Sequence, residues 1–283
     1  GLGNQFLANI RETDAILHIL RCFDDPDVVH VDGSVDPVRD KEIIDTELQL
    51  RDLETVESRI AKVQKQAVTG GDKQAAKLAG LLVRYRDALS RGNNARTVEL
   101  ANQDEERMAR ELFLLTNKPV LYVCNVDEKS AQSGNLYTRK VAEILEKENE
   151  QYLIVAGRIE SEIAELESFQ ERQMFLESIG LEESGVSRLV KAAFRLLELE
   201  TYFTAGPMEV KAWTCRKGTK APQAAGLIHS DFEHGFIRAE VIKFDDFMRY
   251  GSEAACREAG KMAVEGKNYM VQDGDIMHFL FSR

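Results

Sequence analysis

The sequence has few residues that could cross-link the chain and no long apolar run. Its four cysteines stand alone, without a CxxC pair or a closely spaced histidine, which disfavours a disulfide framework and a zinc site. No apolar stretch approaches the roughly eighteen residues that a membrane span needs. No signal-peptide pattern opens the chain. These absences predict a globular protein of the reducing cytoplasm, with neither zinc nor a membrane as partner.

The phosphate-binding motif GxxxxGK[ST] is also absent from the sequence. In that motif a glycine-rich loop and its lysine hold the phosphates of a nucleotide. Gly70-Gly71-Asp72-Lys73 has a different spacing and is interpreted as a turn. The chain opens on Gly1-Leu2-Gly3-Asn4 rather than on methionine, which is typical of a chain interior. We therefore expect an N-terminally truncated chain without catalytic turnover of its own.

What the sequence does contain is the alternation of an open α/β sheet. The chain has 283 residues, of which 43% are hydrophobic and 30% charged, which suggests two or three structural units. Short apolar runs typical of buried parallel strands alternate with helical patterns. The predicted strands are 15–20, 120–124 and 152–155, and the predicted helices are 137–148 and 185–199.

Between the first two strands, apolar residues recur at alternating spacings of three and four. The stripe stops at Gly70-Gly71, resumes beyond it, and so predicts an antiparallel helical hairpin with Asp72 as N-cap of the returning helix. The stripe consists of Leu53, Val56, Ile60, Val63, Ala67, Leu78, Leu82, Tyr85 and Leu89.

The same region carries most of the clustered positive charge. The whole chain has a net charge of −11, yet residues 59–96 have nine basic and two acidic side chains. Such a local excess is a candidate surface for a polyanion such as RNA. A solvated helical face would show the same composition, and the sequence leaves both interpretations open.

The C-terminal part changes to β patterns and predicts a compact α+β unit. Strands are expected at 210–215 and 236–242, and short helices at 221–228 and 253–262. Residues 269–271 and 276–281 flank the turn Gln272-Asp273-Gly274-Asp275 and predict a hairpin.

Asn125-Val126-Asp127-Glu128 follows the second predicted strand directly. It therefore lies at a carboxyl strand edge, where open α/β sheets bind ligands. Guanine-selective proteins have Asn-Lys-x-Asp at such a position, whereas this chain has Val126 and Glu128 in place of the lysine and the aspartate. The change should relax or invert the base preference. A plain strand-ending turn is the alternative.

Several longer segments resemble the YchF family of Obg-like ATPases, in order along essentially the whole chain. Residues 1–15 resemble the segment after the DxxG switch, 125–128 the altered base-recognition motif, and 159–166 the segment after the third base-side loop. The C-terminal stretches 202–206, 220–222, 229–232 and 235–241 are similar to the TGS domain of that family.

The resemblance implies a P-loop-type α/β nucleotide domain with an inserted helical arm and a C-terminal β-grasp (TGS) domain. The corresponding segments are 1–45 and 117–199 for the nucleotide domain, 46–116 for the arm, and 200–283 for the TGS domain. It implies slow hydrolysis of ATP in preference to GTP by the intact protein, association with ribosomes, and Mg²⁺ held by residues outside this chain.

The resemblance also implies roles for individual residues. Adenine should contact Asn125 and Val126, the latter through its backbone. Phe23 should pack against the base, although a core aromatic has the same signature. His30 corresponds to a loop histidine proposed to position water, although a lone histidine is more often a surface residue. The remaining nucleotide-binding candidates are Glu128, Ala156 and Gly157. Relatives often have small residues where this chain has Arg158.

For the arm, the prediction is contact with ribosomal RNA through its basic side chains. The predicted contact residues are Lys62, Lys65, Lys73, Lys77, Arg84 and Arg86. A non-catalytic adaptor that binds RNA or the ribosome is the competing interpretation for a chain without the phosphate-binding motif.

Overall fold

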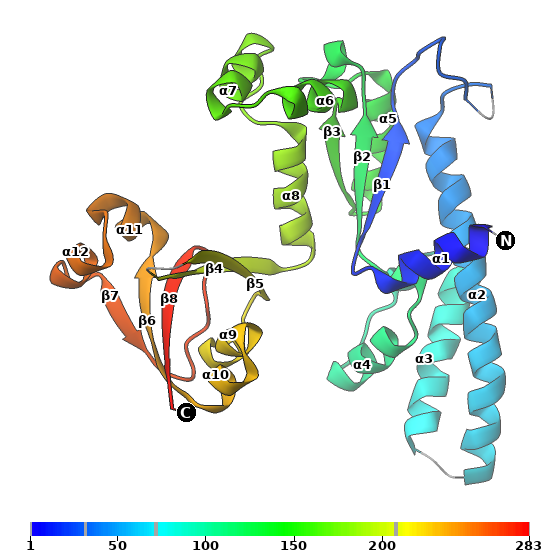
Figure 1. Ribbon diagram of the computed structural model, residues 1–283. Coiled ribbons are helices and arrows are strands. Elements are labelled where there is room, and N and C mark those ends of the chain that lie inside the picture. Colours follow the sequence, from blue (N-terminus) through cyan, green and yellow to red (C-terminus); the bar gives the residue numbers. More distant parts are fainter. Residues whose placement is uncertain (1, 31–32, 71–72, 207–208, 283) are drawn as a thin grey trace. The chain divides into compact units, whose positions relative to one another are not determined.

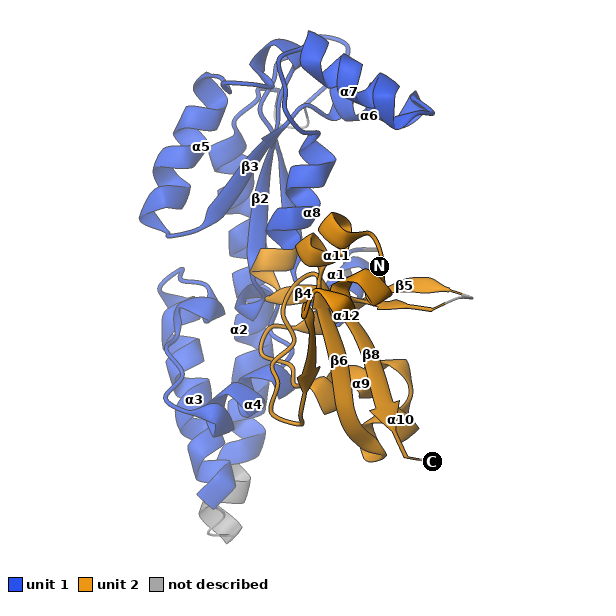
Figure 2. Ribbon diagram, turned by 90° about the vertical axis from the view of Figure 1, so that its left-hand side faces the viewer, with its two compact units in different colours: residues 1–193 blue, residues 194–283 orange. Residues whose placement is uncertain are grey.

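The computed structural model describes residues 2–30, 33–70, 73–206 and 209–282, with side chains except at 2, 4 and 65–70 (Figure 1). The chain divides into two compact units, Gly1–Ala193 and Phe194–Arg283 (Figure 2). Each unit has hydrophobic clusters of its own. The four-segment domain division inferred from the sequence stays a prediction.

The first unit is built on a three-stranded parallel sheet in the order β1-β2-β3. Its strands are β1 (Ile16–Arg21), β2 (Val120–Asn125) and β3 (Gln151–Val155). The central strand β2 is buried from Val120 to Cys124, as its unbroken apolar run predicts. The predicted parallel α/β sheet is thus confirmed, and its strands match the sequence-based ranges to within a residue or two.

Helices cover this sheet and join its strands (Figure 1). Helix α5 begins at a capping box between Asn135 and Thr138, close to the predicted start of a helix at 137. Four helices of the first unit had no sequence prediction: α1 (Leu2–Glu12), α4 (Gln103–Glu111), α6 (Gly157–Glu165) and α7 (Phe169–Ser178). The other two beside the sheet are α5 (Leu136–Lys147) and α8 (Gly185–Leu196).

Two long helices, α2 (Pro37–Gly70) and α3 (Lys73–Ser90), lie side by side in the first unit. The apolar stripe forms their common core, in which Val56, Leu82 and Tyr85 are fully buried. Helix α2 continues without a break through the predicted domain boundary at residue 46. The predicted N-cap Asp72 and the side chain of Ala67 lie outside the described residues.

The chain returns from α3 to the sheet through two short 3-10 helices on either side of α4. These are η1 (Ala95–Thr97) and η2 (Leu115–Asn117). The buried carboxylate of Asp52, on α2, accepts hydrogen bonds from Leu115 and Thr116 of η2. The long helices are thereby fixed to the segment that leads into β2.

The second unit has a five-stranded mixed sheet in the order β5-β4-β8-β6-β7, in which only β4 and β8 pair in parallel. Its strands are β4 (Leu199–Ala205), β5 (Val210–Arg216), β6 (Phe236–Lys243), β7 (Met262–Glu265) and β8 (Asp275–Phe281). Four short helices pack around it: α9 (Ala221–Ile228), α10 (Ser230–His234), α11 (Phe244–Tyr250) and α12 (Glu253–Glu258).

The structure corrects the predicted hairpin. Strand β8 pairs with β4 and β6, whereas Met270 forms only an isolated bridge with Lys220. The predicted turn exists, with Gly274 at φ 81°. The segment before it pairs instead with Thr219–Ala221: Ala221 N donates to Tyr269 O, and Val271 N to Thr219 O.

Two helix ends were also predicted wrongly, and two strands were missed. The helix predicted at 253–262 ends at Glu258, because Gly260 adopts φ 69° and β7 begins at Met262. The helix predicted at 185–199 ends at Leu196, where Glu198 at φ 52° turns the chain into β4. Each predicted helix thus includes the first residue of a strand, Leu199 of β4 or Met262 of β7, and the sequence patterns do not predict the rest of either strand.

His18 on β1 is expected to make the stability of the first unit depend on pH. Its ring centroid lies 5.4 Å from that of Tyr122, and burial lowers its pKa, with Asp45 and Lys41 acting in opposite directions. In the unfolded chain the imidazole of His18 binds a proton at about pH 6.5, whereas in the folded chain it binds that proton only at a lower pH. Stability should fall as the pH drops below that value, by at most about 1.4 kcal/mol per pH unit.

A urea titration at pH 7 and at pH 5, followed by circular dichroism, checks this expectation. His18→Phe keeps a ring beside Tyr122 and should reduce the loss of stability at pH 5. His234→Phe, at an exposed histidine of the second unit, is the control. If His18→Phe loses as much stability between pH 7 and pH 5 as the parent does, titratable groups other than His18 cause the loss.

Candidate functional site

The candidate site lies where the three parallel strands of the first unit end. Arg21 is opposite Asn125 in the sheet register, and Asn125 is opposite Val155. The segments that follow these strands therefore leave the sheet at one edge, seen at the top of the three strands in Figure 1. They carry Phe23, residues 125–128 and residues 156–157. The topology thus brings together the predicted base-side residues.

The side chain of Asn125 is fixed at this edge by the first residue of α6. Its Oδ1 accepts a hydrogen bond of 2.9 Å from Gly157 N. A Cβ at position 157 would lie 3.1 Å from that oxygen, so the approach suits glycine. In the described part of the chain, the Nδ2 group of Asn125 donates no hydrogen bond. The amide therefore presents a donor, which suits an acceptor such as a purine ring nitrogen.

Val126 and Ala156 form the buried part of the edge. Val126 is 3% exposed, and its N–H donates to Val155 O over 2.9 Å. Ala156 is 4% exposed and directly precedes α6. Since the Val126 amide already pairs with β3, that N–H could bind a base only by leaving the strand ladder.

Phe23 lies half-buried at the start of the loop after β1. Its ring is 4.9 Å from the guanidinium of Arg21. The same guanidinium donates to the carbonyls of Phe23, Asp25 and Val28 over 2.9–3.3 Å. Asn135 Nδ2 donates to Cys22 O over 2.7 Å and ties the loop to the start of α5. Arg21 therefore holds the loop that carries Phe23.

Glu128 and Arg158 connect two of the segments at this edge. Arg158 Nε lies 3.0 Å from Glu128 Oε1 and 3.8 Å from a carboxylate oxygen of Glu162. The side chains of Arg158 and Glu128 are 79% and 50% exposed. The sequence marks Arg158 only as a departure from the small residues of relatives, and no pattern in it indicates Glu128 as its partner.

His30 has a carboxylate partner that sequence reasoning missed. Its Nε2 lies 2.9 Å from Asp40 Oδ2, and only 17% of the side chain is exposed. Arg39 contacts the other oxygen of Asp40 over 3.2 Å. Asp40 is in the first turn of α2, ten residues after His30. An acidic residue in a first helical turn after the loop was the available signal.

The predicted RNA-contact residues fall into two groups. Acidic neighbours pair with Lys77 (Asp104, 3.2 Å), Arg84 (Glu105, 2.6 Å) and Arg86 (Asp87, 2.8 Å). The Arg84 guanidinium also lowers the pKa of Glu105. Lys62 and Lys73 are exposed and have no ion-pair partner among the described residues. The side chain of Lys65 lies outside them. The acidic run Asp104-Glu105-Glu106 was the signal that sequence reasoning overlooked.

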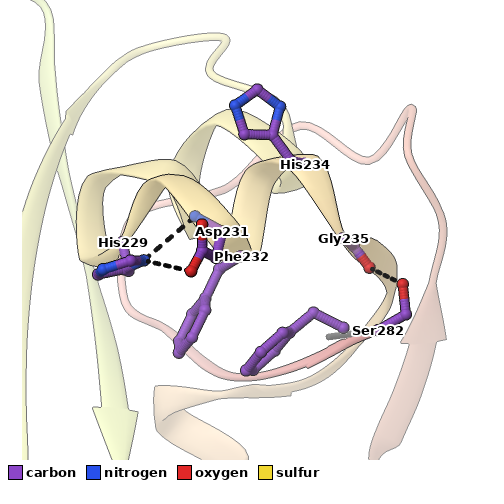
Figure 3. Close-up of a pocket in the computed structure, with 7 residues that line it drawn as sticks. His229, Asp231, Phe232, His234, Gly235 and Ser282 are labelled. Carbon is purple, nitrogen blue, oxygen red and sulfur yellow. Dashed lines mark hydrogen bonds and ion pairs between the residues drawn. The ribbon is translucent and has the colours of Figure 1, made fainter.

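The structure also has pockets away from this edge. One in the second unit has a volume of about 790 Å³ and lies beside the stacked rings of Phe232 and Phe281, 3.9 Å apart (Figure 3). His229 Nδ1 accepts from Asp231 N over 3.2 Å on its rim. Another, of about 500 Å³, lies between α1, β1 and α2 in the first unit. None of the predicted site residues lines either pocket.

The described residues contain neither a candidate metal site nor a candidate membrane span. No three or more His, Cys, Asp and Glu side chains are grouped so that they could hold a metal ion. Of the helices described, none combines the length and the apolar character needed to span a bilayer.

Comparison with known proteins finds relatives along the whole chain. The C-terminal residues 199–282 match the family model YchF-GTPase_C, described as "Protein of unknown function (DUF933)". The chain is 50% identical to "Ribosome-binding ATPase YchF" of Bacillus subtilis, over 100% of the chain and 77% of that protein. It is 48% identical to the protein of the same name from Escherichia coli O157:H7, with the same coverage.

Eukaryotic relatives match as well. The chain is 45% identical to "Obg-like ATPase 1" of Rattus norvegicus, over 100% of the chain and 72% of that protein. The solved structure of the Schizosaccharomyces pombe YchF GTPase superposes with a TM-score of 0.87 at 33% identity, over 99% of this chain and 75% of that one.

Proposed function

Because the chain belongs to the YchF family of Obg-like ATPases, we propose that it binds a purine nucleotide at the carboxyl edge of β1–β3 and couples nucleotide state to ribosome binding in the cytoplasm. The contact between Gly157 N and Asn125 Oδ1 carries this proposal, because it leaves the Asn125 amide as an oriented donor. In a protein that also has the phosphate-binding motif, ATP is the preferred nucleotide and is hydrolysed slowly. The relatives' names include both "ATPase" and "GTPase", so the preference is a point to test.

Two parts of the molecule serve as contact modules in this proposal. Helices α2 and α3 form a basic arm for ribosomal RNA, and the second unit acts as a β-grasp (TGS) module. The mixed sheet of the second unit, with β4 and β8 parallel, supports that assignment. In the site itself, Phe23 packs against the base, Val126 and Ala156 form an apolar wall, and His30, oriented by Asp40, positions water.

An adaptor that binds the ribosome without turnover is the second candidate. It is favoured by the absence of GxxxxGK[ST] from the 283 residues, since phosphoryl transfer needs groups that hold and neutralise the phosphates. An ATP hydrolysis assay on this chain separates the two. Turnover above background would contradict the adaptor, whereas ribosome binding without turnover would support it.

Asn125→Asp is expected to weaken adenine binding about tenfold. The aspartate keeps an oxygen for Gly157 N but loses the Nδ2 donor, so the edge stays folded and one contact to the base is lost. Adenosine and ATP are titrated into the 283-residue chain, with the Gly157 amide followed by NMR. Asn93→Asp, at an exposed asparagine, is the control. Equal affinities for both variants would place the base elsewhere.

A further inference from the structure

Two polar contacts join the end of β2 and the turn after it to the first two residues of α6. Asn125 Oδ1 accepts from Gly157 N at 2.9 Å, and Glu128 Oε1 is 3.0 Å from Arg158 Nε. The first contact orients an amide donor, as described above. The second contact engages the carboxylate at the far end of the same tetrapeptide. The donor and the carboxylate thus belong to one short surface segment, and Arg158 is attached to the carboxylate.

The chemistry of the two purines makes this contact important. Adenine and guanine both offer N7 as an acceptor, so the Asn125 donor does not tell them apart. Guanine also has donors at N1 and at its 2-amino group, whereas adenine has an acceptor at N1 and no 2-amino group. An ionised carboxylate is only an acceptor and would match the guanine donors. An unengaged Glu128 would therefore favour guanine.

We propose that Arg158 determines base specificity, by engaging the Glu128 carboxylate so that it cannot form a two-point contact with guanine. The inference rests on the proposed nucleotide function. Guanine could use Glu128 only after displacing the guanidinium, which itself has no acceptor to offer the guanine donors. Adenine has its donors on the 6-amino group beside an acceptor at N1, so it offers no pair of adjacent donors for the two oxygens of Glu128. The ion pair thus discriminates against guanine while leaving the adenine contacts unchanged.

The side chain of Arg158 contributes little to the folding of the first unit, so its substitution can be tested without disrupting the structure. Its side chain is 79% exposed, and both its carboxylate partners are about half exposed. An exposed pair of this kind adds little to folding stability. The main chain of α6 is fixed separately, by Gly157 N on Asn125 and by the buried side chains of Ile159 and Ile163. Arg158→Ala should therefore fold as the parent does.

The experiment measures dissociation constants of adenosine and guanosine by NMR titration of the 283-residue chain. In Arg158→Ala, guanosine should bind about three- to fivefold more tightly, with adenosine changed less than about twofold. The matched control is Arg107→Ala, which removes an equally exposed arginine paired with a glutamate over 3.2 Å on α4. Adding Glu128→Gln to Arg158→Ala should cancel the gain, because the freed carboxylate is then absent.

The possible outcomes distinguish a failure of the specificity role of Arg158 from a failure of the proposed nucleotide function. If adenosine binds and Arg158→Ala leaves guanosine affinity unchanged, the specificity role is wrong and the nucleotide site stands. A guanosine gain that persists with Glu128→Gln would also overturn it, because the carboxylate would not be the cause. If neither nucleoside binds to any variant, the proposed nucleotide function fails, and the specificity role with it.

Discussion

Replacing Asp52 with alanine is expected to lower the free energy of unfolding of the first unit by about 3–5 kcal/mol. Asp52 is 0% exposed. Its carboxylate accepts from Leu115 N at 2.8 Å and from the N and Oγ1 of Thr116, both at 2.7 Å. Thr116 Oγ1 in turn accepts from Ala95 N at 3.0 Å. Alanine would leave two buried amides of η2 without an acceptor and disrupt the link to η1.

Asparagine at this position should not rescue the loss. Burial raises the pKa of Asp52, while the three hydrogen bonds oppose that shift, so an amide would avoid the burial of charge. It would also turn one oxygen into an NH₂ group that faces an N–H donor. We therefore expect Asp52→Asn to be destabilised as well, and the loss to follow from the missing acceptor rather than from the missing charge.

The single tryptophan makes the measurement specific to one unit. Trp213 is on β5 of the second unit, so its fluorescence reports on that unit, whereas far-UV circular dichroism is dominated by helices. In urea, Asp52→Ala should lower the dichroism midpoint and leave the fluorescence midpoint in place. Asp104→Ala, at a 62% exposed side chain, is the control and should change stability by less than about 0.5 kcal/mol. Equal dichroism midpoints in the two variants would refute the anchoring role.

The sequence was informative wherever burial determined the pattern. Strand β2 is buried on both faces, so its apolar run is continuous, and Asn125 at its end follows directly from the parallel topology. The stripe around Val56 and Leu82 was readable for the same reason. In contrast, β4 is half-buried over most of its length. The turn before β4 is made by Glu198 at φ 52°, where no glycine indicates the end of the helix.

Hydrophobic patterns did not reveal the polar partners of the predicted site residues. Glu128 pairs with Arg158, His30 with Asp40, and Lys77 with Asp104, across separations of ten to thirty residues. Charged residues are frequent in this chain, so many such pairings are compatible with the sequence. The choice among them depends on how the backbone places exposed side chains, and hydrophobic periodicity carries no information about that.

Reversing the charges of Lys62 and Lys73 is expected to weaken ribosome binding by about tenfold or more at physiological salt. These two exposed lysines have no ion-pair partner in the described ranges of the chain. Lys73 is the first residue of α3, which has no acidic residue in its first turn. A cation there opposes the helix dipole, and an external anion such as a phosphate would offset that cost.

Lys77 and Arg84 should matter less, because each must leave a carboxylate on α4 before it can contact a phosphate. We expect Lys62→Glu with Lys73→Glu to reduce the slope of log affinity against log salt by about two, one unit for each lost phosphate contact. Lys77→Glu with Arg84→Glu should reduce it by less. Co-sedimentation with ribosomes over a salt series measures all of these slopes.

The control is Lys140→Glu with Lys147→Glu, two exposed lysines of α5 that give the same change in net charge. If this pair weakens binding as much as the Lys62 and Lys73 pair, only the total charge matters, and the arm is not the contact surface. A loss confined to the arm variants, with the steeper change at Lys62 and Lys73, would instead mean that α4 limits which part of the arm is available to RNA. The acidic run of α4 would then determine where the ribosome is contacted.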